Sequence, residues 1–333
     1  MLPTYAEVMH DSAKDIDKLE AQRKSLKSKL TVYNWLLCLV FLTMIILFFY
    51  ESDLFLISVV GFVIMVILWY RSRYKRVRQY REAFKHGVVA PMMKSMLKLC
   101  SLPNETDKYT YSAKFYPDRR IDNEWIKKTK LYDIKIDEIT GEDLFKGTFG
   151  LTDFMFSELK LVQEQDVTDS DGGSSKSRVT MFKGILFIAD FHKDFEGITI
   201  LNSNVGRGGF LGRLMGRLIS TSYKAPVKIK LESEAFNQQF QTRTTDEIKA
   251  RYILSSSMME RLLAFKKRHK GSISVSFVDS FMCISMWSNK NYFESKLSQP
   301  VTGKHLETIY EDMKFFFGWI EEFDLNTRIW SKD

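Results

Sequence analysis

Two long apolar runs near the N-terminus dominate the pattern of hydrophobic and polar positions. Residues 31–50 contain no charged side chain, and after a three-residue break with two acids, residues 54–70 form a second uncharged run. An α-helix rises about 1.5 Å per residue, so 20 residues cover the roughly 30 Å hydrocarbon layer of a bilayer. The second run is shorter, but it ends on Trp69 and Tyr70, which suit the headgroup level. The pattern predicts two transmembrane helices in a tight antiparallel hairpin.

Basic side chains flank this hairpin on both sides and are absent from the break between its arms. They are Lys14, Lys18, Arg23, Lys24, Lys27 and Lys29 before it, and Arg71, Arg73, Lys75, Arg76, Arg78, Arg81 and Lys85 after it. By the positive-inside rule, this distribution predicts a multi-pass protein of the plasma membrane with both termini in the cytoplasm. A cleavable signal peptide is not expected, because the first run begins late, is too long and lacks a small-x-small cleavage site.

The segments next to the hairpin read as helices. A polar helix is expected before residue 31, with a thin apolar stripe. Residues 71–105 continue the second span as a basic helix that is interrupted near Gly87 and Pro91. Its basic side chains are candidate contacts with anionic lipid, or simply the charges that stop membrane transfer. The candidates are Arg71, Arg73, Lys75, Arg76, Arg78 and Arg81.

Further along the chain the pattern changes to strands and amphipathic helices. Residues 226–232 alternate as a half-buried strand, and residues 272–278 alternate before an Asp279-Ser280 break and a second strand, which predicts a hairpin. A helix before that hairpin has Ser257 and Glu260 in capping-box spacing. A final helix over residues 303–323 has one broad apolar face, formed by Leu306, Ile309, Met313, Phe316, Phe317 and Ile320.

These elements predict an α+β fold in four parts. We expect a cytoplasmic N-terminal helix over residues 1–30, the transmembrane hairpin over 31–70 and the basic juxtamembrane helix over 71–105. Residues 106–333 are expected to form a cytoplasmic domain of antiparallel sheet with flanking helices, in which residues 166–177 are a flexible loop by composition.

One short segment separates apolar from basic side chains. Over residues 209–220, helical spacing places Phe210 and Leu214 on one side and Arg213 and Arg217 on the other. A basic amphipathic helix of this kind can lie in a lipid interface or dock on a partner, and it can equally pack on its own core. Lipid contact through these four residues is therefore one hypothesis among three.

Charge and cysteine usage narrow the function classes. The formal net charge is +8, but residues 1–85 hold 13 Lys and Arg against 8 Asp and Glu, so most of the excess belongs to the membrane-flanking segments. Nucleic acid is therefore not an expected partner. Cys38, Cys100 and Cys283 are unpatterned, which fits a reducing compartment.

No motif of recognisable chemistry stands out. The five histidines are scattered without ligand spacing, the glycines near residue 208 lack a following Lys-Ser/Thr, and there is no GxSxG elbow. No catalytic residue, cofactor or metal is predicted. An enzyme stays open as an alternative, because a nucleophile and its base can be far apart in sequence.

Several stretches resemble a bacterial family known as domain of unknown function 3137. They are GEDLFKGTFG, FMFSELKLV, FKGILFIADFHKDFEG, KLESEAFNQQF, ARYILSSSMMERLL and LNTRIW, spread over residues 84–330. The resemblance implies a bacterial inner-membrane protein, often with two spans and without an assigned activity, and it associates the family with LemA-type membrane proteins. The function expected is interaction or scaffolding at the membrane, with the bilayer and a membrane protein as partners. The alternatives are a membrane-proximal enzyme and an accessory subunit of a membrane complex.

Overall fold

The two apolar runs lie on two long helices in the computed structural model, which describes residues 2–12, 16–49, 54–101, 109–132, 135–168, 174–191, 196–203, 226–269, 271–323 and 325. The chain divides into two compact units. The hairpin unit comprises Pro3–Met96 and Phe293–Asp312, and the sheet unit comprises Met1–Leu2, Leu97–Tyr292 and Met313–Asp333.

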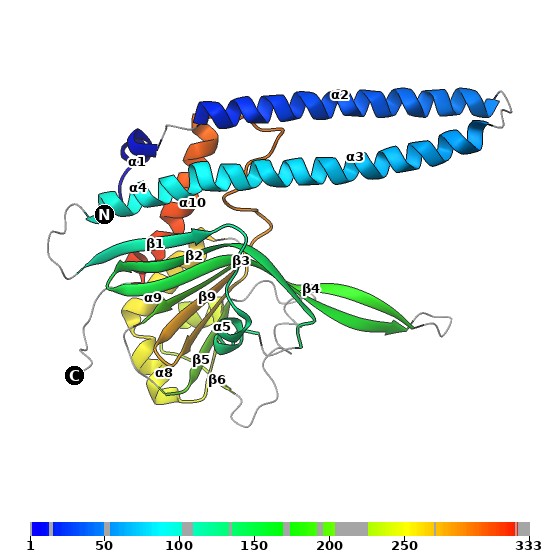
Figure 1. Cartoon of the computed structure of the whole chain (residues 1–333). Coiled ribbons are helices and arrows are strands. Elements are labelled where there is room, and N and C mark those ends of the chain that lie inside the picture. The colour runs from blue at the N-terminus through cyan, green and yellow to red at the C-terminus, as the bar shows by residue number, and fades with distance from the viewer. Residues whose placement is uncertain are drawn as a thin grey trace. The chain divides into compact units, whose positions relative to one another are not determined.

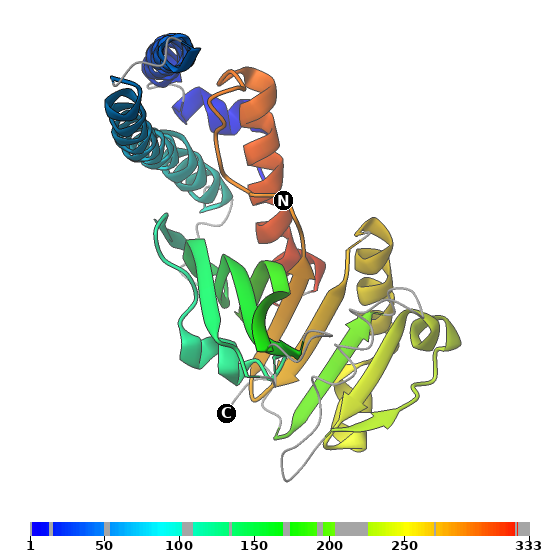
Figure 2. The same ribbon diagram turned by 90° about the vertical axis from the view of Figure 1, so that its right-hand side faces the viewer.

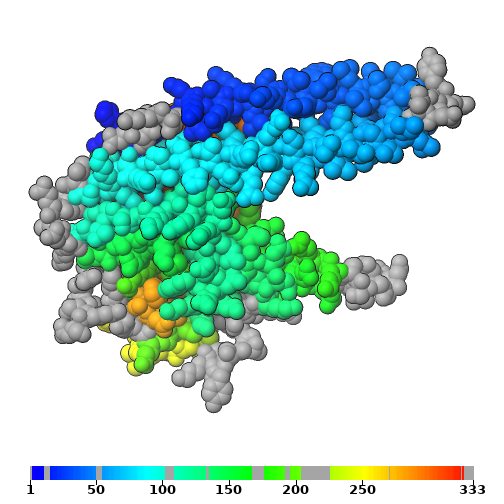
Figure 3. Space-filling view, in the orientation of Figure 1, coloured from blue at the N-terminus to red at the C-terminus, as the bar shows by residue number. Residues whose placement is uncertain are grey.

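In the hairpin unit, the short helix α1 (Tyr5–Ser12) precedes α2 (Ile16–Phe49) and α3 (Leu54–Phe84) (Figure 1). Rings of α2 meet rings of α3 along the apolar part: Phe41 lies 5.6 Å from Phe62, and Phe48 lies 5.1 Å from Phe55, between ring centroids. The two helices lie side by side in the space-filling view (Figure 3). The predicted helical hairpin is confirmed.

The expected interruption after the second span is a change of helix type. Helix α3 passes into a π-helical turn, η2 (Lys85–Val89), and continues as α4 (Ala90–Ser101). Pro91 has no N–H to donate to the carbonyl of Gly87, so the regular α-helical ladder cannot continue unbroken. A Cβ on Gly87 would lie 3.1 Å from Leu19 Cδ1, so the missing side chain lets α2 approach closely.

A nine-stranded antiparallel sheet forms the sheet unit, in the order β1-β2-β3-β4-β9-β8-β5-β7-β6 (Figures 1 and 2). The strands are β1 (Thr110–Tyr116), β2 (Glu138–Gly150), β3 (Thr152–Thr168), β4 (Ser174–Asp190), β5 (Ile198–Ser203), β6 (Val227–Ile229), β7 (Phe240–Thr244), β8 (Ile273–Val278) and β9 (Phe281–Trp287). With its helices, this sheet confirms the predicted α+β class. The predicted β8–β9 hairpin is confirmed too, and Asp279 turns it at a φ of 54°.

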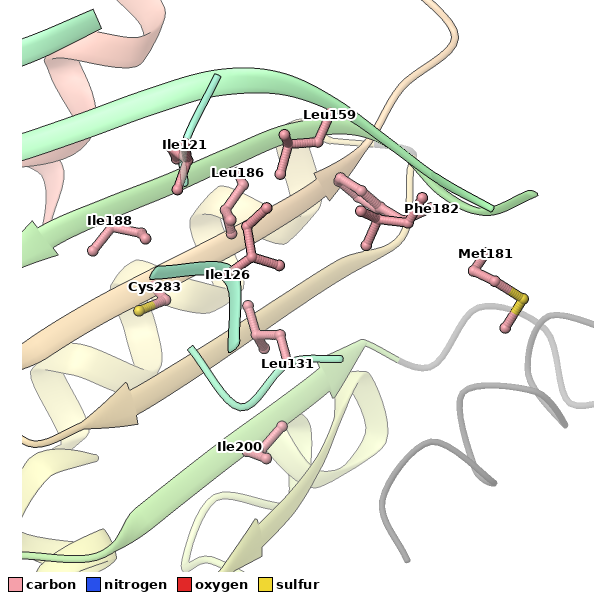
Figure 4. Packing of buried hydrophobic residues seen from close by; sticks show 11 residues of the cluster. Ile121, Ile126, Leu131, Leu159, Met181, Phe182, Leu186, Ile188, Ile200 and Cys283 are labelled. Carbon is pink, nitrogen blue, oxygen red and sulfur yellow. The ribbon is translucent and has the colours of Figure 1, made fainter. Parts of the chain in front are cut away.

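Both faces of the central strands are covered, which explains why residues 185–189 of β4 form a continuous apolar run. Leu186 and Ile188 join a cluster that includes Ile126 of α5 (Asn123–Lys128) (Figure 4). The intervening Phe187 meets Trp319 of α10 (Gly303–Glu322), with ring centroids 5.1 Å apart. Successive strand residues point to opposite faces, so a strand buried on both sides loses its alternation.

The final helix has the predicted bounds to within a residue, and its predicted apolar face is buried. All six residues of that face are at most 3% exposed. Within the sheet unit, Phe316 of α10 lies 5.1 Å from Phe156, which itself stacks on Phe145 at 4.6 Å, between ring centroids. Aromatic pairs at such distances contribute beyond their buried area, so α10 is a principal part of this core.

Three local predictions were wrong. The strand expected over residues 226–232 is shorter, because Ser233 caps α7 (Glu234–Gln239) by accepting a hydrogen bond from the Phe236 N–H. On this edge strand Val227 is 69% exposed.

The second correction concerns the cap of α9 (Ser256–Arg268). The cap is Ser255 rather than Ser257, and its side chain accepts a hydrogen bond from the Met258 N–H.

The third correction concerns residues 166–177, expected to be a loop. Strand β3 extends to Thr168 and β4 begins at Ser174, so only residues 169–173 lie outside the described residues here. Backbone pairing continues along both strands, with Asp166 opposite Lys176. The amino-acid composition does not reveal these strands, because their side chains are polar. The backbone hydrogen bonds that pair the two strands do not depend on apolar side chains.

Candidate functional site

The membrane-facing part of the hairpin unit is apolar and exposed. Helices α2 and α3 are each long and apolar enough to cross a membrane, and none of the most apolar stretch of either is buried. Large apolar side chains left exposed over such a length are stable only in a nonpolar medium. The pair of helices therefore supports membrane association and contact with the lipid bilayer.

Cations and aromatic rings meet where the apolar runs end. The guanidinium carbon of Arg73 lies 5.2 Å from the ring centroid of Trp69, and that of Arg76 lies 5.6 Å from the ring centroid of Tyr33. Aromatic rings and snorkelling basic side chains are typical of the membrane–water boundary. These pairs lie at the ends of the apolar runs, where such a boundary is expected on both helices.

Below this level, a buried ion pair fastens α2 to a distant segment. Arg23 is 4% exposed, and it donates to both carboxylate oxygens of Glu20, at 2.8 and 2.6 Å, and to the carbonyl of Leu297 at 2.7 Å. Glu20 also accepts from the Val301 N–H at 3.0 Å. The hydrogen bond from Arg23 lowers the pKa of Glu20 to about 2, so the pair is ionised at neutral pH.

The same distant segment is also fastened to α3. We call Phe293–Asp312 the clasp segment. The hydroxyl of Tyr80 lies 3.0 Å from that of Ser295, and Arg81 lies 3.6 Å from Glu294. The ring of Phe84 lies 5.6 Å from that of His305. The clasp segment therefore binds both helices of the hairpin through buried or half-buried contacts.

Helix α1 adds a third attachment to the clasp segment. Tyr5 donates a hydrogen bond to the carbonyl of Gly303 at 3.1 Å, and its ring centroid lies 5.6 Å from that of Tyr310. Tyr310 in turn donates to the carbonyl of Pro3. The N-terminus, both long helices and the clasp segment thus form one polar and aromatic network, of which the sequence pattern gave no sign.

The predicted lipid contacts after the second span all lie on α3. Five of them, Arg71, Arg73, Lys75, Arg78 and Arg81, are exposed, and Arg76 is half-buried. Arg78 pairs with Glu82 at 2.8 Å. Contact of these side chains with lipid stays a prediction. The other four candidates, Phe210, Arg213, Leu214 and Arg217, lie outside the described residues.

Two thiols and one histidine of the sheet unit are candidates for chemistry, and they are buried or half-buried. Burial raises the pKa of Cys283 to about 12 and that of Cys100 to about 11, so both thiols stay protonated at neutral pH. Burial, with nearby Arg268 and Lys266, lowers the pKa of His269 to about 4. In the part of the chain that the structure describes, no three His, Cys, Asp or Glu side chains gather as metal ligands.

Comparisons with known proteins give one structural likeness. The crystal structure of the mycobacterial trehalose monomycolate transport factor A, TtfA, is similar over 61% of this chain and 88% of that chain, with 8% identity and a TM-score of 0.29. A likeness of this degree carries no argument about fold or function. No curated protein matches the chain.

A family model gives the firmer match. It covers part of the chain that contains ARYILSSSMMERLL, the most specific of the stretches noted in the sequence, and most of the strands and helices that follow β4. The chain matches the family described as Protein of unknown function (DUF3137) over residues 180–325, which confirms the resemblance expected from its sequence.

Proposed function

We propose that this protein is a membrane-anchored interaction or scaffolding module of the bacterial inner membrane, with both termini and the sheet unit in the cytoplasm. One observation carries the proposal: the clasp segment, almost 300 residues beyond the N-terminus, is fastened to both hairpin helices through Arg23, Tyr80 and Arg81. An anchor that only retained a domain near the membrane would need no such attachment.

The attachment continues into α10. This helix runs without a break over Gly303–Glu322, beginning in the hairpin unit and ending in the sheet unit. Its first part contains clasp residues such as His305, and its last part contains core residues of the sheet unit such as Trp319.

The charge distribution supports a cytoplasmic sheet unit. Basic residues flank both ends of the hairpin, and the break between the runs has none. The scaffold proposal also fits the burial of Cys100 and Cys283, which pack in the core.

Photo-crosslinking in native membranes tests the proposal. The positions are Ile248 and Tyr252, which lie one turn apart on α8 (Glu247–Ile253) and are 83% and 53% exposed. Exposed apolar side chains are where a protein partner makes contact most readily. We expect a discrete adduct with one membrane protein at these positions, identified by mass spectrometry and recovered in the reciprocal purification.

The matched control is a crosslinker at Lys176 of β4, whose side chain is 72% exposed but charged. It should give no such adduct. The same faint background at all three positions, with no enriched membrane protein, would contradict an interaction role for the sheet unit.

A further inference from the structure

An open groove of about 770 Å³ lies between α2 and α3, wholly within the hairpin unit. Its volume falls in the range of small-molecule sites, about 300–1,000 Å³. The lining comes from residues 18–33 of α2 and residues 76–83 of α3: Lys18, Ala21, Gln22, Ser25, Leu26, Lys29, Tyr33, Arg76, Gln79, Tyr80 and Ala83. The groove thus follows the two helices just below their apolar runs.

The groove is cationic. Lys18, Lys29 and Arg76 line it, and none of the lining residues is acidic. None of these three cations forms a salt bridge with a described residue, whereas the nearby acids Glu20 and Glu82 are paired with Arg23 and Arg78. Three cations without an ionic partner among the described residues create a positive potential between the two helices, which favours an anion.

One end of the groove lies at the membrane boundary. Tyr33 belongs to the first turn of the apolar run that begins at residue 31, and the guanidinium of Arg76 is held 5.6 Å from its ring centroid. Lys29 precedes the same run by two residues. Lys18 lies 11 residues before Lys29, which is about 16 Å further along α2. The groove therefore extends from the headgroup level toward the clasp segment.

We infer that this groove binds the headgroup of an anionic phospholipid, with the phosphate between Lys29 and Arg76. The inference rests on the proposed membrane anchoring. Ser25 and Gln79 supply neutral hydrogen-bonding groups for headgroup hydroxyls, and the acyl chains lie along the exposed apolar surface above Tyr33. Basic pockets between helices on the cytoplasmic side are a recurrent way to hold such headgroups.

Lipid binding by the purified full chain in neutral detergent tests the inference. Phosphatidylglycerol, phosphatidylcholine and free glycerol 3-phosphate are titrated separately, and bound species are counted by native mass spectrometry. We expect a discrete one-to-one complex with phosphatidylglycerol only. In the variant Lys29→Gln with Arg76→Gln, its affinity should fall roughly 25-fold, at about fivefold per basic side chain near the membrane surface.

The matched control is Lys27→Gln with Lys75→Gln, which removes the same charge from exposed positions of the same helices outside the groove. It should change the affinity by less than about twofold. An equal loss in both double variants would show diffuse surface attraction and overturn the inference. Equal binding of phosphatidylcholine, or of glycerol 3-phosphate, would overturn it as well. If the groove variant does not fold, the single variants Lys29→Gln and Lys27→Gln give the same comparison, with a loss of about fivefold expected only for the first.

A separate experiment tests whether the chain is anchored in the membrane at all. The full chain, before any extraction with detergent, should remain in the membrane pellet after alkaline carbonate washing. A chain that stays in the pellet but does not prefer phosphatidylglycerol contradicts only the groove. A chain that the wash releases contradicts the proposed membrane anchoring itself.

Discussion

Replacing Arg23 by alanine is expected to lower the free energy of unfolding of the hairpin unit by about 2–3 kcal/mol. The substitution leaves Glu20, whose side chain is only 18% exposed, without its main partner, and it leaves the carbonyl of Leu297 without its donor. Removing one member of a largely buried ion pair is costly, because the remaining charge is only partly hydrated. The measurement is thermal unfolding of the full chain in detergent micelles, where the transition should fall by several degrees.

The neighbouring Lys24 provides a matched control. It lies 3.9 Å from the same carboxylate, but 72% of its side chain is exposed, so Lys24→Ala should cost at most about 1 kcal/mol. Equal effects of the two substitutions would contradict the buried clasp and reduce Arg23 to an ordinary surface charge.

The pH dependence gives a second readout of the same clasp. The pKa of Glu20 is depressed in the folded protein, so its contribution is fully present above the ordinary pKa of an unfolded glutamate, near 4.5, and is lost as the pH falls toward about 2. The difference in unfolding temperature between the parent and Glu20→Gln should therefore shrink between about pH 5 and pH 2. A difference that stays constant over this range would show that Glu20 does not act through its charge.

Trp319→Ala should have the largest effect in the sheet unit, about 3–5 kcal/mol. Trp319 is fully buried, and its ring centroid lies 5.1 Å from those of Phe187 and Phe265 and 5.3 Å from that of Phe316. Alanine leaves a large cavity between the sheet and two helices, and the surrounding aromatic rings cannot collapse fully into it. Loss of the cooperative unfolding transition, followed by near-ultraviolet circular dichroism, is the expected result.

Trp319→Phe is the discriminating companion. The indole N–H of Trp319 has no hydrogen-bond partner among the described residues, so phenylalanine removes no satisfied polar group and fills most of the volume. It should cost far less than alanine. If phenylalanine were as harmful as alanine, the indole would have a polar role that simple packing does not explain.

The elements that could be predicted from the sequence are those whose hydrophobic pattern lies within one short stretch of chain. The two apolar runs, the stripe of α10 and the β8–β9 hairpin each repeat at a period that belongs to one element, so no distant contact is needed to read them. Strand β4 was not predicted, because burial of both Phe187 and Leu186 removes the alternation that marks a strand.

The clasp was missed for the opposite reason. Residues 293–302 precede α10 without regular structure, and their contacts with Glu20 and Arg23 join positions more than 270 residues apart. In the sequence, Glu20 and Arg23 look like ordinary charges of a polar helix, since nothing local distinguishes a buried ion pair from a solvated one. The cationic groove was missed likewise, because Lys29 and Arg76 line one groove only when the two helices pair.

The central claim, a hairpin that crosses the membrane with both flanks in the cytoplasm, is tested most directly by cysteine accessibility in intact spheroplasts. In a Cys38→Ser background, single cysteines replace Ser52 between the apolar runs, exposed Lys27 on α2 and exposed Asn289 after β9. A membrane-impermeant maleimide should label position 52 before lysis, and positions 27 and 289 only after lysis. Labelling of position 27 or 289 in intact spheroplasts, or protection of position 52, would contradict the account.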